Sequence, residues 1–108
     1  MTYKKITAVV RCTELGDIER ALQEAGVKGL TITHVRGYGE HANFYRDDWT
    51  VKHARLEIFL DEDQVARIVA IIKGTACSGI VAVLPVEQFH HIREAESEEI
   101  GAPPTMEA

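Results

Sequence analysis

Two glycines separated by one residue, Gly37 and Gly39, stand where an alternating segment ends and an aperiodic one begins. Glycine has no Cβ atom, so its backbone N–H group can approach an anion closely. Arg93 adds a planar guanidinium, which can bind phosphate oxygens in pairs. We predict phosphate contact at Gly37 and Gly39, with Arg93 as a fixed cation. A purely structural turn is the alternative explanation of the two glycines.

The other reactive side chains do not have the spacing of a metal site or a catalytic site. No two histidines are spaced as in a zinc site, and adjacent residues of an extended chain point to opposite faces. We expect imidazoles that line a site or the surface: His34, His41, His53, His90 and His91. Cys77 has no base beside it in the sequence. We predict no metal site, and two buried, reduced thiols at Cys12 and Cys77.

The composition is that of one acidic globular domain. The chain has 108 residues, of which 45% are hydrophobic and 27% charged, with a formal net charge of −5. This charge argues against nucleic-acid binding, which needs a basic face. No apolar run is long enough to span a bilayer, and the N-terminus does not resemble a signal peptide. We expect a cytoplasmic protein with no membrane insertion.

Six regular elements are predicted to position these residues. Apolar runs and alternation predict strands over residues 6–10, 30–35, 54–60 and 80–86, with a further short extended piece over 89–93. Helical spacing predicts a first helix between an N-cap at Thr13 and a stop at Gly26. A second helix is predicted after Asp61, with Gln64 completing a capping box.

Three segments lack this periodicity. Residues 37–51 are predicted to be a mobile loop and residues 74–79 a turn-rich connector. Residues 95–108 are acidic and contain prolines, so we expect a flexible tail beyond a folded domain of residues 1–94.

The order strand, helix, strand, strand, helix, strand predicts a ferredoxin-like α+β fold. In this fold an antiparallel sheet is covered by helices on one face. The other face must also be covered, and self-association is the simplest way to do so.

Several short motifs, in their order, resemble the PII signalling proteins. The resemblance covers residues 4–93 and rests on the segments Lys4–Arg11, Ala21–Thr33, Val35–Gly39, Arg55–Ile58 and Val83–Val86, together with Tyr45-Arg46 and Ile92-Arg93. By this resemblance, residues 37–51 of this chain correspond to the T-loop of PII proteins, which contacts partners. Residues 74–79 correspond to the B-loop, which binds phosphate.

The chain also departs from the usual PII pattern. The T-loop is shorter and lacks the tyrosine that is modified in many PII proteins, and the B-loop shrinks to Ala76–Gly79. Glu40 and His41 replace an Arg-Gln pair, and His91 replaces one of two arginines. The chain therefore resembles a shortened PII-like variant of the kind found beside transporters and carboxysome genes.

The resemblance implies a homotrimer with adenine nucleotides bound between its subunits. Thr31 would hydrogen-bond the base, the Phe59 backbone would recognise the base, and Glu57 would contact the ribose. The full set implied is Gly29, Thr31, Gly37, Tyr38, Gly39, Glu40, His41, Glu57, Ile58, Phe59, Gly79, His91 and Arg93. An exposed strand threonine and a solvated carboxylate are the plain structural alternatives for Thr31 and Glu57.

The implied pocket carries fewer permanent cations than a usual PII site. His91 is cationic only near or below about pH 6.5, and the B-loop lysine has no replacement. We expect ADP or AMP to bind at least as well as ATP, and no catalytic cofactor. A second effector is expected to be bicarbonate, near Arg46, Lys52 or His53, and not 2-oxoglutarate.

The resulting hypothesis is a signalling protein and not an enzyme. Nucleotide binding would order the 37–51 loop, which would regulate a transporter or a carboxysome-related protein. One alternative is a small nucleotide-hydrolysing oligomer, for which the available acids are Glu40, Asp47, Asp48 and Glu57. The other is a metal-responsive trimer similar to cation-tolerance proteins.

Overall fold

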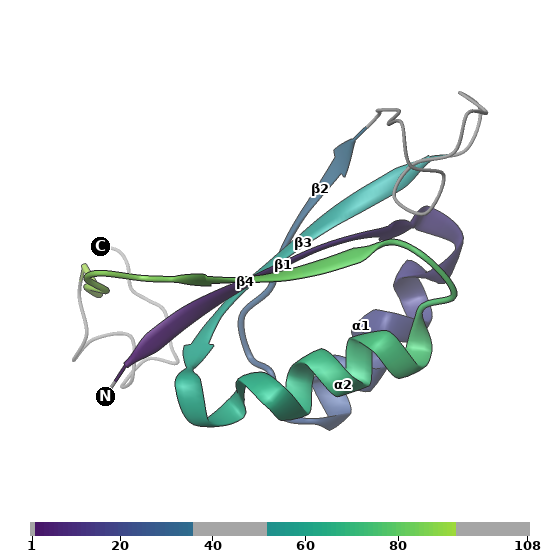
Figure 1. The fold of residues 1–108 in the computed structure, drawn as a ribbon. Helices are drawn as coiled ribbons and strands as arrows, with labels where there is room; N and C mark the ends of the chain where they lie inside the picture. Colours follow the sequence, from purple (N-terminus) through teal and green to yellow (C-terminus); the bar gives the residue numbers. More distant parts are fainter. Residues whose placement is uncertain (1, 36–51, 93–108) are drawn as a thin grey trace, which may run out of the picture.

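A computed structural model describes residues 2–35 and 52–92 of the chain. They form four strands, two α-helices and two 3₁₀ turns: β1 (Tyr3–Arg11), η1 (Cys12–Glu14), α1 (Leu15–Glu24), β2 (Thr31–Val35), β3 (His53–Asp61), η2 (Glu62–Gln64), α2 (Val65–Thr75) and β4 (Ile80–Pro85). The strands form one antiparallel sheet in the order β2-β3-β1-β4 (Figure 1). This confirms the predicted ferredoxin-like α+β fold.

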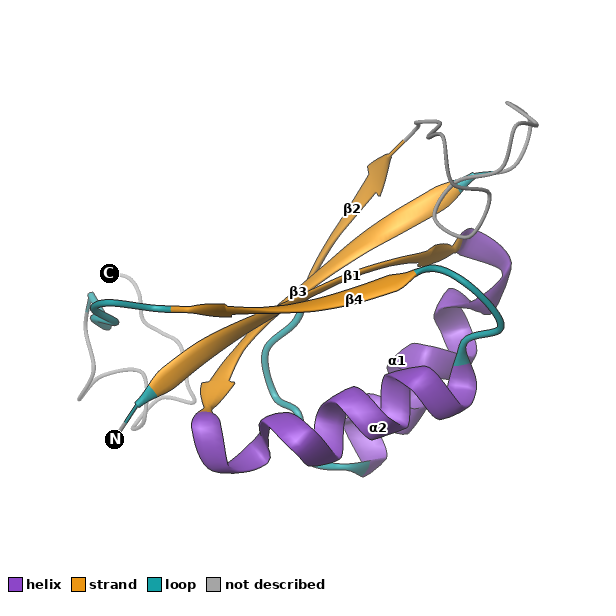
Figure 2. Ribbon diagram, in the orientation of Figure 1, coloured by secondary structure: helices purple, strands orange, loops and turns teal. Residues whose placement is uncertain are grey.

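Both helices lie against the same face of the sheet (Figure 2). Alternate residues of β1 and β3 supply the sheet side of the core, because successive strand side chains point to opposite faces. The helices supply the other side at helical spacing. The buried cluster consists of Ile6, Ala8, Val10, Ile18, Leu22, Leu56, Ile58, Ile68 and Ile72. The helical spacing predicted for the two helices is therefore confirmed by burial of Ile18, Leu22, Ile68 and Ile72.

The first helix ends as predicted but begins differently. Gly26 has φ +94°, and the N–H groups of Gly26 and Val27 donate to the carbonyls of Gln23 and Leu22, both at 3.0 Å. This is a Schellman motif, which favours glycine at this position. The predicted N-cap at Thr13 is wrong, because the chain leaves β1 through η1 and α1 starts at Leu15 without a side-chain cap.

The second helix follows the predicted cap at Asp61, but it begins later, at Val65 after the turn η2. Asp61 Oδ1 accepts a hydrogen bond from the Asp63 N–H at 3.0 Å, so it caps the turn η2. No reciprocal capping-box bond from Gln64 is found among the described contacts. Its Oε1 atom instead accepts from the Arg67 guanidinium. The helix continues to Thr75, so the connector begins at Ala76 and not at Gly74.

The segment after β4 packs through aromatic contacts. Residues 89–92, the described part of the extended piece predicted over 89–93, form no strand, so that prediction is wrong there. Phe89 instead stacks on Tyr3, with ring centroids 4.2 Å apart and planes 8° from parallel. It also lies 5.6 Å from the Phe59 ring.

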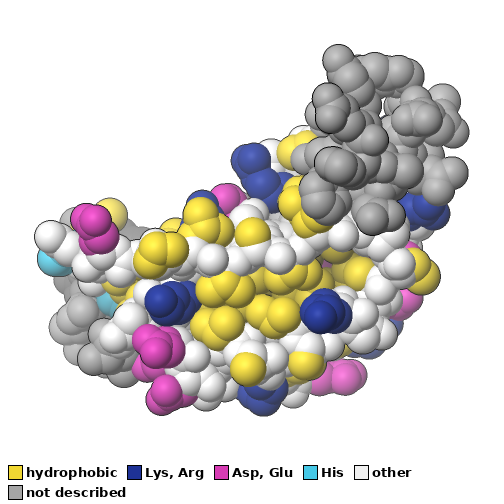
Figure 3. Space-filling model, viewed as in Figure 1, with side chains coloured by type: hydrophobic (Ala, Val, Ile, Leu, Met, Phe, Trp, Pro, Cys, Tyr) yellow, Lys and Arg dark blue, Asp and Glu magenta, His cyan; other side chains and the backbone are white. Residues whose placement is uncertain are grey.

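Among the described residues, no helix lies on the second face of the sheet. That face carries Thr31, Glu57, Lys5, Phe59 and Leu84, which share it by their strand register. Phe59 and Leu84 are 49% and 40% exposed. Apolar side chains also gather over the edge strand β4 and the adjacent α2 (Figure 3), where Val83 is exposed. A single chain therefore leaves apolar surface that another subunit could cover.

Among residues 2–35 and 52–92, neither helix is long and apolar enough to cross a membrane.

Candidate ligand-binding site

Strands β2 and β3 separate at one end of the sheet. Their pairing runs from Val35–His53 to Thr31–Glu57, while β3 continues to Asp61. Gly29 lies just before β2, so Phe59 has no registered partner in that strand. Backbone groups at a strand end of this kind can hydrogen-bond a ligand.

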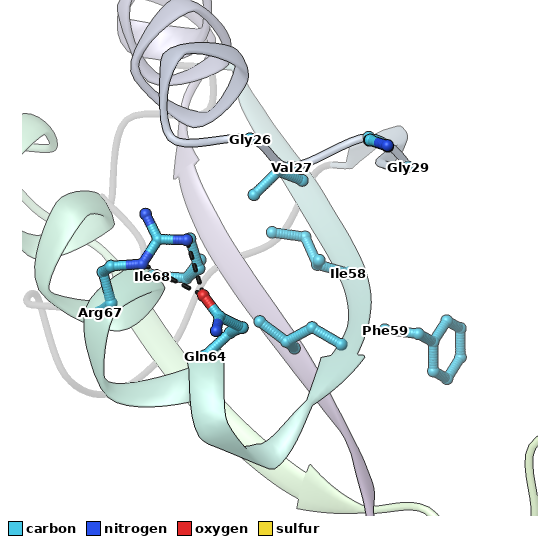
Figure 4. A pocket seen from close by; sticks show the side chains of 10 residues that line it. Gly26, Val27, Gly29, Ile58, Phe59, Gln64, Arg67 and Ile68 are labelled. Carbon is cyan, nitrogen blue, oxygen red and sulfur yellow. Dashed lines mark hydrogen bonds between the residues drawn. The ribbon is translucent and has the colours of Figure 1, made fainter. Parts of the chain in front are cut away.

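A cavity of about 310 Å³ lies where these strands separate (Figure 4). It is bounded by the α1–β2 connection, the end of β3 and the first turns of α2. Its lining is Gly26, Val27, Lys28, Gly29, Ile58, Phe59, Leu60, Gln64, Arg67 and Ile68. Three predicted nucleotide residues, Gly29, Ile58 and Phe59, therefore meet here, although the Phe59 ring points away from Ile68 and Val27.

Three residues that line the cavity were not predicted from the sequence: Lys28, Gln64 and Arg67. Gln64 was interpreted as a capping residue, which assigned it to the helix end and not to the cavity. The signal was its spacing of three from Arg67, since residues at i and i+3 are neighbours on a helix surface.

Thr31 and Glu57 lie side by side on the uncovered face. Thr31 is exposed, and Glu57 Oε2 forms an ion pair with Lys5 Nζ at 2.8 Å. The hydrogen bond from Lys5 lowers the pKa of Glu57. The charges of Lys5 and Arg55 act in the same direction, and partial desolvation opposes them. Glu57 is thus an ionised hydrogen-bond acceptor in the middle of β3, beside the first residue of β2.

The aromatic cluster brings His91 to the end of the sheet where β2 and β3 separate. The His91 ring meets Phe89 edge-on, with centroids 5.1 Å apart, and Phe89 in turn contacts Phe59. Lys5 Nζ lies 5.8 Å from the centre of the Phe59 ring. Four predicted residues, Gly29, Glu57, Phe59 and His91, are therefore gathered within one chain.

Gly79 lies elsewhere in the chain. It precedes β4 next to Val9, towards the opposite end of β1 from the Lys5–Phe59 pair. Gly79 has φ +125°, and an added Cβ would overlap the carbonyl oxygen of Val9. Backbone packing therefore requires glycine here, independently of any ligand. One chain alone does not join Gly79 to the cluster around Phe59.

The second-effector residues divide between described and undescribed parts of the chain. Lys52 is exposed, and its carbonyl accepts from the Cys12 N–H at 3.0 Å. His53 is only 4% exposed at the start of β3. The remaining predicted site residues lie outside the described residues: Gly37, Tyr38, Gly39, Glu40, His41, Arg46 and Arg93. So do the whole 37–51 loop and the whole 95–108 tail.

The two thiols are free, but their predicted burial is wrong. Cys77 is exposed and Cys12 is half-buried. The Cys77 N–H donates to Glu14 Oε1 and Oε2 at 3.2 and 3.1 Å. A hydrogen bond from the thiol to Glu14, together with the carboxylate charge, raises the pKa of Cys77. Because a thiol is nucleophilic as its thiolate, this contact disfavours reactivity at Cys77.

Within the described part of the chain, no three His, Cys, Asp or Glu residues are grouped closely enough to hold a metal ion.

This geometry defines a ferredoxin-like domain with one uncovered sheet face and a pocket at a strand end. The profile of the family described as Nitrogen regulatory protein P-II matches residues 3–96, and the chain belongs to that PII family. The resemblance to PII proteins is thereby confirmed at the level of the family.

The relatives match over most of their length. A Nitrogen regulatory protein P-II of Cereibacter sphaeroides is 35% identical, covering 89% of this chain and 96% of the relative. A Nitrogen regulatory protein GlnK of Escherichia coli is 27% identical over a similar share. A crystal structure of Arabidopsis thaliana PII bound to citrate aligns with a TM-score of 0.66 and 31% identity, over 79% of this chain and 78% of the other.

Membership of the PII family bears on the predictions about assembly, ligands and enzymatic activity. PII proteins are homotrimeric, non-enzymatic signal transducers that bind adenine nucleotides and regulate protein targets. The prediction that the chain is not an enzyme is confirmed. The family assignment also argues against the two alternatives, a nucleotide hydrolase and a cation-tolerance protein.

Proposed function

We propose that this chain is a cytoplasmic signalling protein that binds ADP or AMP, and also ATP, in clefts between the subunits of its trimer. The observation that carries the proposal is the register of β2 and β3, which places Thr31 beside Glu57 on the uncovered face. Gly29 and Phe59 lie at the adjoining end of β2. In a trimer, the phosphate-binding glycines and Arg93 of a neighbouring subunit would complete the cleft.

Each group at this end has a suitable chemical role. The Thr31 hydroxyl donates to or accepts from the edge of the base, and the backbone of Phe59 provides one donor and one acceptor. The ionised Glu57 carboxylate accepts hydrogen bonds from ribose hydroxyls. Lys5, now paired with Glu57, would keep that carboxylate oriented.

The nucleotide preference follows from charge. The short connector Ala76–Gly79 contains no lysine or arginine, and His91 is a weaker cation than an arginine. Few permanent positive charges favour a diphosphate or monophosphate over a triphosphate, because each added phosphate group needs compensation. We therefore expect ADP and AMP to bind at least as tightly as ATP.

The loop at residues 37–51 is proposed to carry the signal to a partner protein. Because the loop is short and has lost the usual modified tyrosine, we assign the chain to the shortened PII-like variants. The proposed partner is a transporter or a carboxysome-related protein. Bicarbonate is the proposed second effector, at Arg46, Lys52 and His53.

Calorimetric titration of the trimer with AMP, ADP and ATP tests this function. We expect saturable ADP binding that weakens in Thr31→Val and Glu57→Gln, with Thr33→Val as the matched control on the same strand and face. ADP at about 100 times its Kd should stabilise the fold by about 2.7 kcal/mol. Lack of binding of all three nucleotides, or ATP binding far tighter than both others, would contradict the proposal.

A further inference from the structure

The cavity at the strand end has a charge opposite to that of the protein. Lys28 and Arg67 both line it, and none of the described residues in its lining is acidic. The whole chain has a formal net charge of −5, so two lining cations without a lining carboxylate depart from the general pattern. The nearby Asp61 carboxylate accepts from the N–H of Asp63 in its own turn.

The side chains of the cavity offer hydrogen-bond donors. Gln64 Oε1 accepts from Arg67 Nε at 3.2 Å and from Arg67 Nη2 at 2.7 Å, as Figure 4 shows. These two bonds occupy both lone pairs of the amide oxygen. What remains for a ligand is the Gln64 amide N–H₂, the other N–H groups of Arg67 and the Lys28 ammonium. A ligand group here must therefore accept hydrogen bonds, and a negative charge is favoured.

The rest of the cavity lining is largely apolar. Val27, Ile58, Leu60 and Ile68 come from the α1–β2 connection, β3 and α2. The volume of about 310 Å³ is at the small end of ligand pockets, which begin near 300 Å³. The cavity is suited to a short carbon body that carries an anionic group.

We propose that this cavity is a second ligand site, for a small organic anion with a carboxylate or a phosphate group. Arg67, oriented by Gln64, and Lys28 bind the anionic group, and the aliphatic wall receives the carbon body. The site is distinct from the proposed nucleotide site. Ile58 and Leu60, which line the cavity from β3, face the helices, whereas Thr31 and Glu57 lie on the uncovered face. The Phe59 side chain also lies on the uncovered face. The two sites adjoin at Gly29 and Phe59.

Titration of the full-length trimer, without nucleotide, with four probes tests the proposal: succinate and citrate as carboxylates, glycerol 3-phosphate as a phosphate ester, and inorganic phosphate. We expect saturable binding of at least one organic probe. Its affinity should fall about tenfold or more in Arg67→Gln and in Lys28→Gln, because each loses a charged hydrogen bond. The control is Lys73→Gln, on the exposed surface at the last turn of α2. Whichever of carboxylate and phosphate ester binds more tightly identifies the anionic group.

Three results would overturn this inference. They are no binding of any organic probe, equal affinities in Arg67→Gln and Lys73→Gln, and inorganic phosphate binding as tightly as the organic probes. ADP titration separates the two proposals. Arg67→Gln should leave ADP affinity unchanged, whereas an equal loss of ADP and anion binding would show a single shared site. Loss of anion binding alone leaves the proposed nucleotide function intact.

Discussion

At the scale of single residues, the ionisation of Glu57 on the uncovered sheet face makes the stability of the fold depend on pH. Its pKa is lowered chiefly by the hydrogen bond from Lys5, so the folded state binds its proton more weakly than the unfolded chain does. The stabilisation is therefore fully present above the unfolded pKa of about 4.3. It is lost as the pH falls through the lower folded pKa.

Urea unfolding from pH 7 to pH 3 measures this contribution. The stability difference between the wild type and Glu57→Gln should shrink as the pH falls below about 4.3. Glu62→Gln, at an exposed position in η2, is the control for general charge effects. A difference that is constant with pH would contradict the described Lys5–Glu57 pair.

Cys77 should react slowly although it is exposed. Glu14 raises the pKa of the thiol, so less thiolate is present at a given pH. In a Cys12→Ser background, iodoacetamide at pH 8 should alkylate Cys77 more slowly than the same chain unfolded in urea. Glu14→Gln removes the carboxylate charge and keeps an acceptor for the Cys77 N–H, so it should accelerate the reaction. Equal rates in the two variants would refute this role of Glu14.

At the scale of elements, two glycines with positive φ differ in their surroundings. Gly26 has open space around its missing Cβ, whereas a Cβ at Gly79 would overlap the carbonyl oxygen of Val9. We expect Gly26→Ala to cost about 1–2 kcal/mol, from backbone conformation alone. Gly79→Ala should cost clearly more, because the connector must also move away from β1. Denaturant unfolding compares them, and equal costs would contradict the described packing of Gly79.

Most of the extent of the helices and strands could be predicted from the sequence, but the helix starts could not. Periodicity located both helices and all four strands, because burial of Ile18, Leu22, Ile68 and Ile72 imposes helical spacing on the sequence. The helix starts were harder, since the 3₁₀ turns η1 and η2 shift them without changing that spacing. Burial of Cys77 was predicted wrongly although its segment was predicted as a turn-rich connector, because cysteine is a residue type that is usually buried.

Part of the candidate site was predicted from the resemblance to PII proteins and not from periodicity. The resemblance implied Gly29, Thr31, Glu57 and Phe59, and the pairing of β2 with β3 places them near one another. Lys28 and Arg67 join the cavity through the packing of α2 beside the α1–β2 connection. A contact between segments so far apart in the chain has no local sequence signal.

At the scale of the whole molecule, the uncovered sheet face should be the surface that assembles. Leu84 is 40% exposed in the single chain, so Leu84→Glu should barely affect folding of one subunit. A charge buried between subunits is costly, so the same change should shift the trimer to monomers. Light scattering with size-exclusion chromatography measures the mass of the assembly. The control is Ala66→Glu, at an exposed position of α2. A Leu84→Glu protein that remains fully trimeric would contradict this assignment.

The crystal structure of the trimer grown with ADP tests the central claim most directly. The account predicts one nucleotide per cleft, with its base between Gly29 and Phe59 beside Thr31, its ribose at Glu57 and its phosphates towards a neighbouring subunit. A base bound away from these residues, or clefts without nucleotide at saturating ADP, would contradict it.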